Sequence, residues 1–184
     1  MSFCARLSVV AVLAAMALAP ATASAVTADH TGAVDATKTT FSWDSKLGTG
    51  FASVSSNHDG QIGCGTAVVH DCDETLVHVT GCGTLAITND SSDPNAVDTD
   101  LYGYYSNAAG DKVESGPSSA QSTPTPKEAI SMDMQQPDSY ILIEIDYTDN
   151  VAGTVHGVAT FTPADPTQVD PTTCVPIDTG DDGE

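Results

Sequence analysis

The sequence predicts an all-β protein, a β-sandwich of about seven to nine short strands. Apolar and polar residues alternate with a period of two in several segments, and Gly, Pro, Asp and Asn interrupt the chain at short intervals. No segment after residue 25 combines a helical period with capping residues. Alternation places side chains on the two faces of a strand in turn, so each segment can bury one face. Many short strands of this kind are typical of a two-layer sandwich.

Residues 1–25 have the layout of a secretory signal peptide. Arg6 precedes an apolar run from Leu7 to Ala19, and Ala23-Ser24-Ala25 provides small side chains for cleavage. A membrane anchor is the alternative, but Pro20 ends the run short of the roughly 20 residues that a spanning helix needs. We therefore expect a secreted, extracellular chain with no membrane attachment after signal cleavage.

The mature chain is predicted to begin with a flexible leader over residues 26–38, which are small and polar. Strands are then expected over residues 39–162, and the clearest alternation places Ile141, Ile143 and Ile145 on one face and Glu144 and Asp146 on the other. Trp43 lies on an early strand, where a core position is more common than a sugar-stacking one. Further strands are predicted over residues 75–80, 84–88, 129–135 and 154–162, of which the first two, joined through Gly81 and Gly83, are expected to form a hairpin.

Two segments are predicted to lack regular structure. Residues 116–126 are rich in Ser, Pro and Thr, and proline opposes ladder pairing within a sheet. Residues 163–184 form an acidic, Pro- and Asp-rich C-terminal tail. The leader and the tail leave one domain over residues 39–162, in which residues 116–126 are a loop between strands.

The charge of the chain is strongly negative. Lys and Arg number 5 against 25 Asp and Glu, a formal net charge of −20. Such a surface repels phosphate groups, which excludes nucleic acid and anionic membranes as partners. Cations remain as partners, although excess carboxylates also serve only to keep a secreted protein soluble.

Four cysteines follow the signal peptide: Cys64, Cys72, Cys82 and Cys174. An even number in an exported chain predicts two disulfides, with three pairings open. We favour Cys64–Cys72 as a local clamp and Cys82–Cys174 as a tie between the tail and the body. Zinc ligation is the alternative, but the spacing between these cysteines is not that of a zinc site.

The segment from Val97 to Tyr105 carries the most functional information. On a strand, the side chains of Asp98, Asp100, Tyr102 and Tyr104 share one face, while Thr99, Leu101 and Tyr105 share the other. One face of this strand is therefore predicted to be acidic and aromatic.

Four short motifs occur in an order that resembles the bacterial pre-peptidase C-terminal (PPC-like) domain family. They are Cys72-Asp73-Glu74-Thr75-Leu76, Asp98-Thr99-Asp100-Leu101-Tyr102, Pro137-Asp138-Ser139-Tyr140 and Gly157-Val158-Ala159-Thr160. The resemblance implies a jelly-roll-like β-sandwich without catalytic activity, of a kind usually attached to secreted peptidases. The chain departs from the family at Asp138-Ser139, where a glycine is usual, and at Gly103, which indicates a bulge or a close backbone approach.

Calcium is the cofactor that the acidic residues of the sequence indicate. Ca²⁺ takes six to eight oxygen ligands, and Asp71, Asp73, Asp98 and Asp100 would form such a set if their strand ends were neighbours. The alternative is that these carboxylates are solvated, as is common for Asp in turns.

No catalytic motif is found, and we expect no enzyme activity. The sequence has no Gly-x-Ser-x-Gly elbow or His-Glu-x-x-His array, and His78 is expected to be a half-buried or edge residue. The expected function is a binding domain for an extracellular protein or polysaccharide, with Tyr102, Tyr104 and Tyr140 as its contact face. The alternative is a structural or folding-assistant protein for a separately encoded secreted peptidase.

Overall fold

The computed structural model describes residues 28–47, 50–51, 72–91, 99–119, 127–149 and 153–178. The described residues form ten strands and no helix, so none of their segments is a helix that could cross a membrane. The predicted signal peptide, Cys64, Asp71 and Asp98 lie outside the described residues. The strands are β1 (His30–Val34), β2 (Thr40–Leu47), β3 (Gly50–Phe51), β4 (Cys72–Thr80), β5 (Gly83–Ser91), β6 (Thr99–Ser106), β7 (Lys112–Ser119), β8 (Lys127–Asp133), β9 (Asp138–Asp149) and β10 (Gly153–Pro163).

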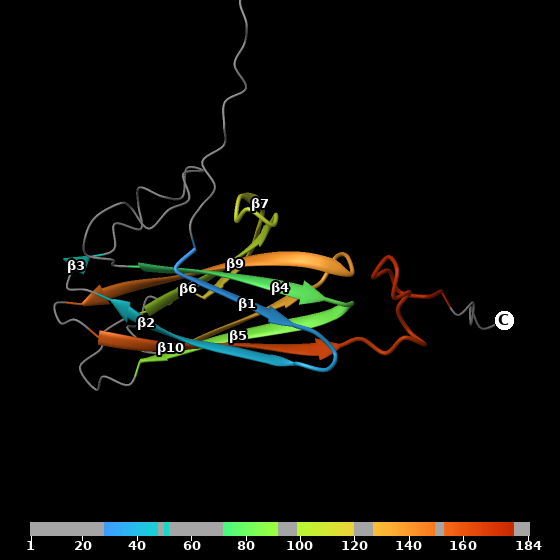
Figure 1. The fold of residues 1–184 in the computed structure, drawn as a ribbon, viewed down its shortest axis with the longest axis horizontal. Helices are drawn as coiled ribbons and strands as arrows, with labels where there is room; N and C mark the ends of the chain where they lie inside the picture. Colours follow the sequence, from blue (N-terminus) through green and yellow to red (C-terminus); the bar gives the residue numbers. More distant parts are fainter. Residues whose placement is uncertain are drawn as a thin grey trace, which may run out of the picture.

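The strands form two layered sheets, which confirms the predicted all-β sandwich (Figure 1). Sheet A has the order β1-β4-β9-β6-β7, with β3 also paired to β9, and sheet B has the order β2-β10-β5-β8. Among the described pairs, only β1 and β4 run parallel. Neighbouring strands in each sheet are mostly distant in sequence, so the fold depends on long-range pairing.

The core lies between the sheets and is built by the alternation that the sequence shows. Ile141, Ile143 and Ile145 of β9 are fully buried from sheet A. They face the buried side chains of sheet B, which include Ile130 and Met132 of β8, Leu85 and Ile87 of β5, and Val155, Ala159 and Phe161 of β10. These inward faces agree with the sequence prediction.

The predicted hairpin of residues 75–80 and 84–88 is wrong. β4 pairs with β1 and β9 in sheet A, whereas β5 pairs with β10 and β8 in sheet B. Gly81 and Gly83 have φ angles of +116° and +153°, values that favour glycine, and they turn the chain from one layer into the other. Alternation identifies the faces of a strand but not its partner, so it could not distinguish a hairpin from this crossover.

The predicted flexible leader is partly wrong, because β1 lies inside residues 26–38. Its residues pair in register with β4, from His30 opposite Thr75 to Val34 opposite Val79. Val34 is 1% exposed and joins the core. The strand is short and its residues are small, so backbone pairing at the sheet edge orders a segment that shows no apolar alternation.

The predicted loop over residues 116–126 begins too early, because β7 continues to Ser119. Pro117 is accommodated since β7 is the edge strand of sheet A and its register with β6 shifts between Tyr102 and Tyr104. Gly103 lies at this shift, and a Cβ there would meet Met132 Sδ at 2.6 Å. The bulge and the close approach that the sequence indicated at Gly103 are therefore both present.

The tail is more ordered than predicted as far as residue 178. The disulfide between Cys82 and Cys174, separated by 92 residues, confirms the favoured pairing and holds the tail against the β4–β5 crossover. Asp165 and Asp170 each accept hydrogen bonds from the backbone N–H and hydroxyl of a threonine two residues later. Side-chain turns of this type order a segment that contributes no core residue.

Trp43 is a core residue, as predicted, and it packs against Gly157 across the β2–β10 ladder. Its side chain is 5% exposed, and a Cβ at position 157 would lie 2.3 Å from the indole ring. We expect Gly157→Val to lower the free energy of unfolding by about 2 kcal/mol, because overpacking displaces the indole. Urea denaturation measures this change, with Ala86→Val on an exposed site of β5 as the control. Equal stability of the two variants would contradict the prediction.

Candidate functional site

The outer face of sheet A, which points away from sheet B, carries an unusual set of acidic and aromatic side chains. Register places Glu74 of β4, Glu144 of β9 and Tyr102 of β6 side by side in one row. The adjacent row on one side contains Cys72, Asp146 and Asp100. The adjacent row on the opposite side contains Leu76, Leu142 and Tyr104. We refer to Glu74, Asp100, Glu144 and Asp146 as the outer carboxylate cluster.

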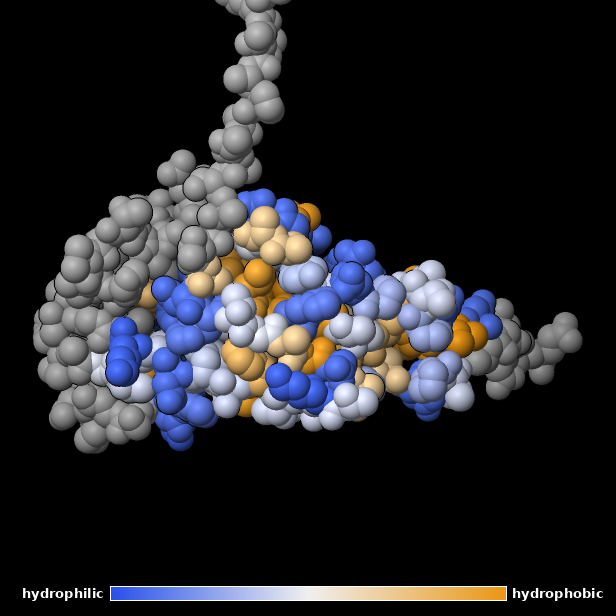
Figure 2. All heavy atoms as spheres, in the orientation of Figure 1, coloured by the Kyte–Doolittle hydropathy of each residue, from blue (hydrophilic) through white to orange (hydrophobic). Residues whose placement is uncertain are grey.

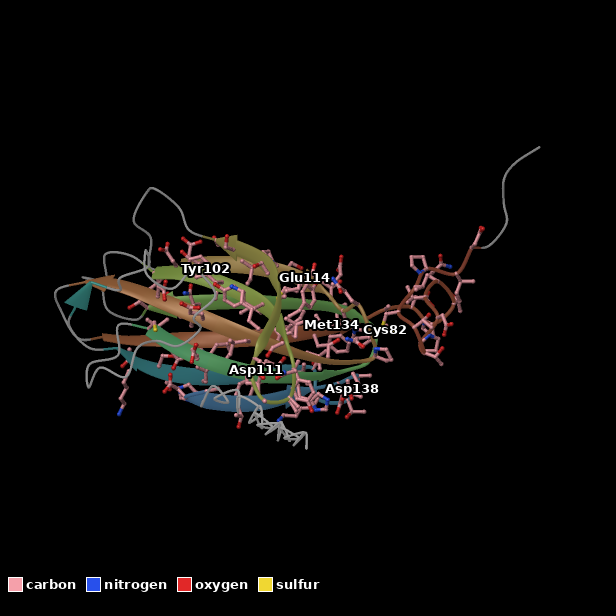
Figure 3. All side chains as sticks on the ribbon, turned by 90° about the horizontal axis from the view of Figure 1, so that it is seen from above. Cys82, Tyr102, Asp111, Glu114, Met134 and Asp138 are labelled. Atoms are coloured by element: carbon pink, nitrogen blue, oxygen red, sulfur yellow. A yellow bond between two sulfur atoms is a disulfide. The ribbon has the colours of Figure 1, made fainter. Side chains whose placement is uncertain are left out.

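Most of these side chains are buried although they lie outside the sandwich core. The exposed fractions are 4% for Glu74, 8% for Glu144 and 5% for Asp146. Tyr102 and Tyr104 are each 7% exposed and form a second apolar cluster with Leu142. The predicted contact face is therefore wrong for these two tyrosines, because both side chains are buried (Tyr102 is labelled in Figure 3).

The carboxyl groups and tyrosines of this face contact one another. Glu144 and Asp146 are hydrogen-bonded through their side chains, and the Tyr104 hydroxyl donates to Glu144. The Tyr102 hydroxyl donates to Asp100. The ammonium group of Lys112 lies 3.5 Å from the centre of the Tyr104 ring. By contrast, Oε1 of Glu74 is buried and has no hydrogen-bond partner among the described residues.

Burial and repulsion between neighbouring carboxylates raise the pKa values of several side chains on this face. Burial, followed by the nearby Glu144 carboxyl, raises the pKa of Asp146 to about 8. The same two causes raise the pKa of Glu74 to about 7. Burial also raises the pKa of both Tyr102 and Tyr104. Without a bound cation, these carboxyl groups therefore hold protons at a pH where exposed carboxyls are ionised.

The four aspartates predicted as one calcium site do not converge as a set. Asp100 lies on the outer face of sheet A, in register with Asp146. Asp73 points inward, where its Oδ1 accepts hydrogen bonds from Trp43 Nε1 at 3.2 Å and Thr75 Oγ1 at 2.9 Å. Strand alternation separates these two carboxylates by the thickness of the sheet, so one ion cannot bind both. The positions of Asp71 and Asp98 lie outside the described residues.

The structure adds two residues that the sequence prediction missed, Glu144 and Asp146. Their signal was visible, since both alternate with the core isoleucines of β9 and were expected to face away from the core. A side chain that points away from the core is normally exposed to solvent, and alternation in the sequence cannot show that this outer face is buried. Cys72 lies in the same row and is disulfide-bonded; its predicted partner, Cys64, lies outside the described residues.

A second feature is a pocket at the end of the sandwich where the β6–β7 and β8–β9 turns meet. It has a volume of about 360 Å³, within the usual range for ligand sites. We call it the turn-end pocket, and Figure 3 shows two of its residues, Glu114 and Asp138. Its lining is Tyr105, Ser106, Asn107, Ala108, Val113, Glu114, Gln135, Gln136, Asp138, Ser139 and Tyr140.

Both turns around the pocket are held by side-chain hydrogen bonds. The Asn107 side-chain oxygen accepts from the backbone N–H groups of Ala109 and Asp111 at 2.9 and 3.0 Å. The Ser139 hydroxyl donates to the Gln136 carbonyl at 2.8 Å. Tyr140, the third predicted contact residue, is half-buried, and its ring stacks on His78 with centroids 4.5 Å apart. The pocket is thus preformed.

The described histidines form no recognisable catalytic arrangement. His30 contacts Asp73 at 3.1 Å, His156 contacts Asp44 at 2.8 Å, and His78 contacts Asp138. An acyl-transfer site needs a hydroxyl or thiol nucleophile next to such a histidine. Within the described part of the chain, these contacts have the form of ion pairs at the surface and the sheet edges.

Comparison with known proteins shows only distant structural similarity. No family model matches the chain, and no curated protein matches it. The pre-peptidase C-terminal domain of a collagenase from Bacillus anthracis has 10% identity and a TM-score of 0.39, covering 70% of this chain and 93% of that one. The Yersinia pseudotuberculosis-derived mitogen has 12% identity and a TM-score of 0.41, covering 75% and 97%.

A third solved structure is PliG from Aeromonas hydrophila, a periplasmic inhibitor of g-type lysozyme. It has 6% identity and a TM-score of 0.36, covering 72% of this chain and 98% of that one. With similarities this low, the ligand and the activity of the present chain have to be argued from its own residues.

Proposed function

We infer that this chain is an exported, non-catalytic binding domain that recognises a polysaccharide through the turn-end pocket. The supporting observation is the composition of a preformed pocket: two aromatic rings, three side-chain amides and two carboxylates around two turns that side-chain hydrogen bonds hold. Aromatic rings pack against the C–H faces of sugars, and amide and carboxylate groups bond to neighbouring hydroxyls.

The charge of the pocket narrows the class of polysaccharide. The described residues of its lining include Glu114 and Asp138 but no Lys or Arg. The whole chain carries a net charge of −20, and Figure 2 shows hydrophilic residues distributed among smaller apolar areas on the described surface. An acidic glycan would be repelled by this surface. A neutral glycan or one that carries amino groups is therefore the expected ligand.

Retention on insoluble cellulose and chitin tests this function. We expect the mature protein to sediment with at least one of them, and Tyr140→Ala to weaken retention roughly tenfold, because the loss of an aromatic anchor costs about 1 to 2 kcal/mol. Gln135→Ala should weaken it less, and Gln168→Ala in the tail should leave it unchanged.

Beads that carry a basic protein test the alternative, a protein ligand, in the same experiment. Retention on these beads alone would identify a protein ligand and contradict the polysaccharide. Retention on a glycan that Tyr140→Ala leaves unchanged would contradict the pocket. Circular dichroism of each variant should show the unaltered β spectrum, which separates loss of binding from loss of fold.

A further inference from the structure

The outer carboxylate cluster has the donor set of a cation site. Glu74, Glu144 and Asp146 occupy adjacent positions on β4 and β9, and each is less than one-tenth exposed. An isolated charge is expensive to bury, so buried carboxylates are normally paired with a cation or protonated. Three such groups on one sheet face therefore need a common explanation.

The described cations do not neutralise this cluster. The chain after residue 25 contains four lysines and no arginine. Lys127 pairs with Asp90 at 2.8 Å in sheet B, and Lys38 and Lys46 lie on or before β2 in the same sheet. Only Lys112, from β7, approaches the outer face, and its ammonium group lies against the Tyr104 ring. One lysine does not balance four carboxylates.

The unpartnered oxygen of Glu74 provides an independent sign of a ligand. Glu74 is 4% exposed, and within the described part of the chain its Oε1 has no hydrogen-bond partner although Glu144 is its register neighbour. A buried oxygen without a partner loses the hydrogen bonds it made to water, at a cost of about 1 to 3 kcal/mol or more when charged. A cation bound beside it would restore that coordination.

The cysteine in this cluster restricts the kind of cation. Cys72 Sγ and the carboxylate oxygens of Glu144 and Asp146 all lie within 4.8 Å of one another. Because Cys72 is disulfide-bonded, it provides no thiolate for a soft metal such as zinc or copper. The remaining donors are oxygens only, which favours a hard cation that accepts several carboxylates, as Ca²⁺ does.

We propose that Glu144 and Asp146, whose carboxylate oxygens lie within 4.8 Å of each other, form a calcium site on the outer face of sheet A together with their register neighbours Glu74 and Asp100. This site differs from the aspartate set expected from the sequence, since it excludes Asp73 and is centred on β9. The ion would join β4, β9 and β6 across three strands and neutralise their buried charge. The proposal is independent of the polysaccharide site, which lies at the turns.

Calorimetric titration of CaCl₂ into the chelator-treated mature protein at pH 7.5 tests the site. We expect one ion per chain with a dissociation constant on the order of 10⁻⁴ M, as in extracellular modules, and a rise in Tm with calcium. Asp146→Asn and Glu74→Gln should each weaken calcium binding at least tenfold. Asp138→Asn and Asp44→Asn, which alter exposed carboxylates elsewhere, should bind calcium as the parent does.

The amide variants keep the experiment decisive even if calcium is needed for full stability. Each replaces a carboxyl group with a neutral group of the same shape, so both should fold in chelator with a Tm at or above that of the parent. Parent protein that shows neither heat nor a Tm change up to 5 mM CaCl₂, on the order of fifty times the expected constant, would overturn the proposal. Undiminished calcium binding by both variants would also overturn the proposal. Magnesium at equal concentration should bind more weakly than calcium.

Discussion

Replacement of both Cys82 and Cys174 by serine should lower the free energy of unfolding by about 4 to 5 kcal/mol. The bridge spans 92 residues, and closing a loop of that length removes a large amount of conformational entropy from the unfolded chain. Urea denaturation of the double variant measures the loss. A decrease below about 1 kcal/mol would show that the unfolded chain is already restricted in this region.

The same variant should release the tail while leaving the sandwich folded. The described contacts that fix residues 164–178 to the body are few: the disulfide and the hydrogen bond from the Ala164 N–H to the Cys82 carbonyl. Limited proteolysis should therefore cleave the tail first, and circular dichroism should retain the β spectrum. Simultaneous loss of both would mean that the bridge is required for folding of the sheets.

The metal-free protein should lose stability as the pH rises from about 4 to about 8. Burial and the neighbouring Glu144 raise the folded-state pKa of Asp146 to about 8 and of Glu74 to about 7. Between the unfolded and folded values, the folded state binds more protons, so the free energy of unfolding decreases with pH. Below pH 4 both states are protonated, and above pH 8 both are ionised, so the curve should flatten at each end.

The expected decrease is on the order of several kcal/mol, since one pKa unit corresponds to about 1.4 kcal/mol. Desolvation also raises the pKa of buried Asp73, which adds to the effect. Exposed Asp35, Asp165 and Asp170 have lowered pKa values and act in the opposite direction at low pH. Thermal denaturation at several pH values in chelator measures the curve.

The double variant Glu74→Gln and Asp146→Asn is the control for this pH dependence. It should flatten the curve between pH 5 and 8, because the replaced groups no longer titrate. A parent protein whose stability rises over this interval would contradict the assignment of raised pKa values to Glu74 and Asp146.

The sequence predicted the faces of the strands better than their partners. Ile141, Ile143 and Ile145 point into the core because alternation is a local property that the sequence shows directly. The partners of β4 and β5 depend on the whole arrangement of both sheets, and the local glycine turn is compatible with either a hairpin or a crossover. β1 was missed for the same reason, since its stability comes from pairing with a distant strand.

The candidate sites could be predicted only in part. Tyr102, Tyr104, Glu144 and Asp146 were each placed on the correct face, but burial of that face depends on contacts that have no periodic pattern. The calcium set was chosen on the condition that the strand ends carrying its aspartates are neighbours, and alternation itself separates Asp73 from Asp100. Tyr140 was identified as a contact residue, whereas the rest of its pocket comes from turns that meet only in the folded chain.

The irregular edge strand β7 of sheet A also affects whether copies of this chain associate at high concentration. An unpaired edge strand can add a strand from another molecule, and this is a common route to fibrous aggregates. In β7, Pro117 lacks a donor N–H and the register shift bends the strand, so a second chain could not extend the ladder evenly. The proline that is unfavourable within a sheet therefore protects this chain from joining its own copies.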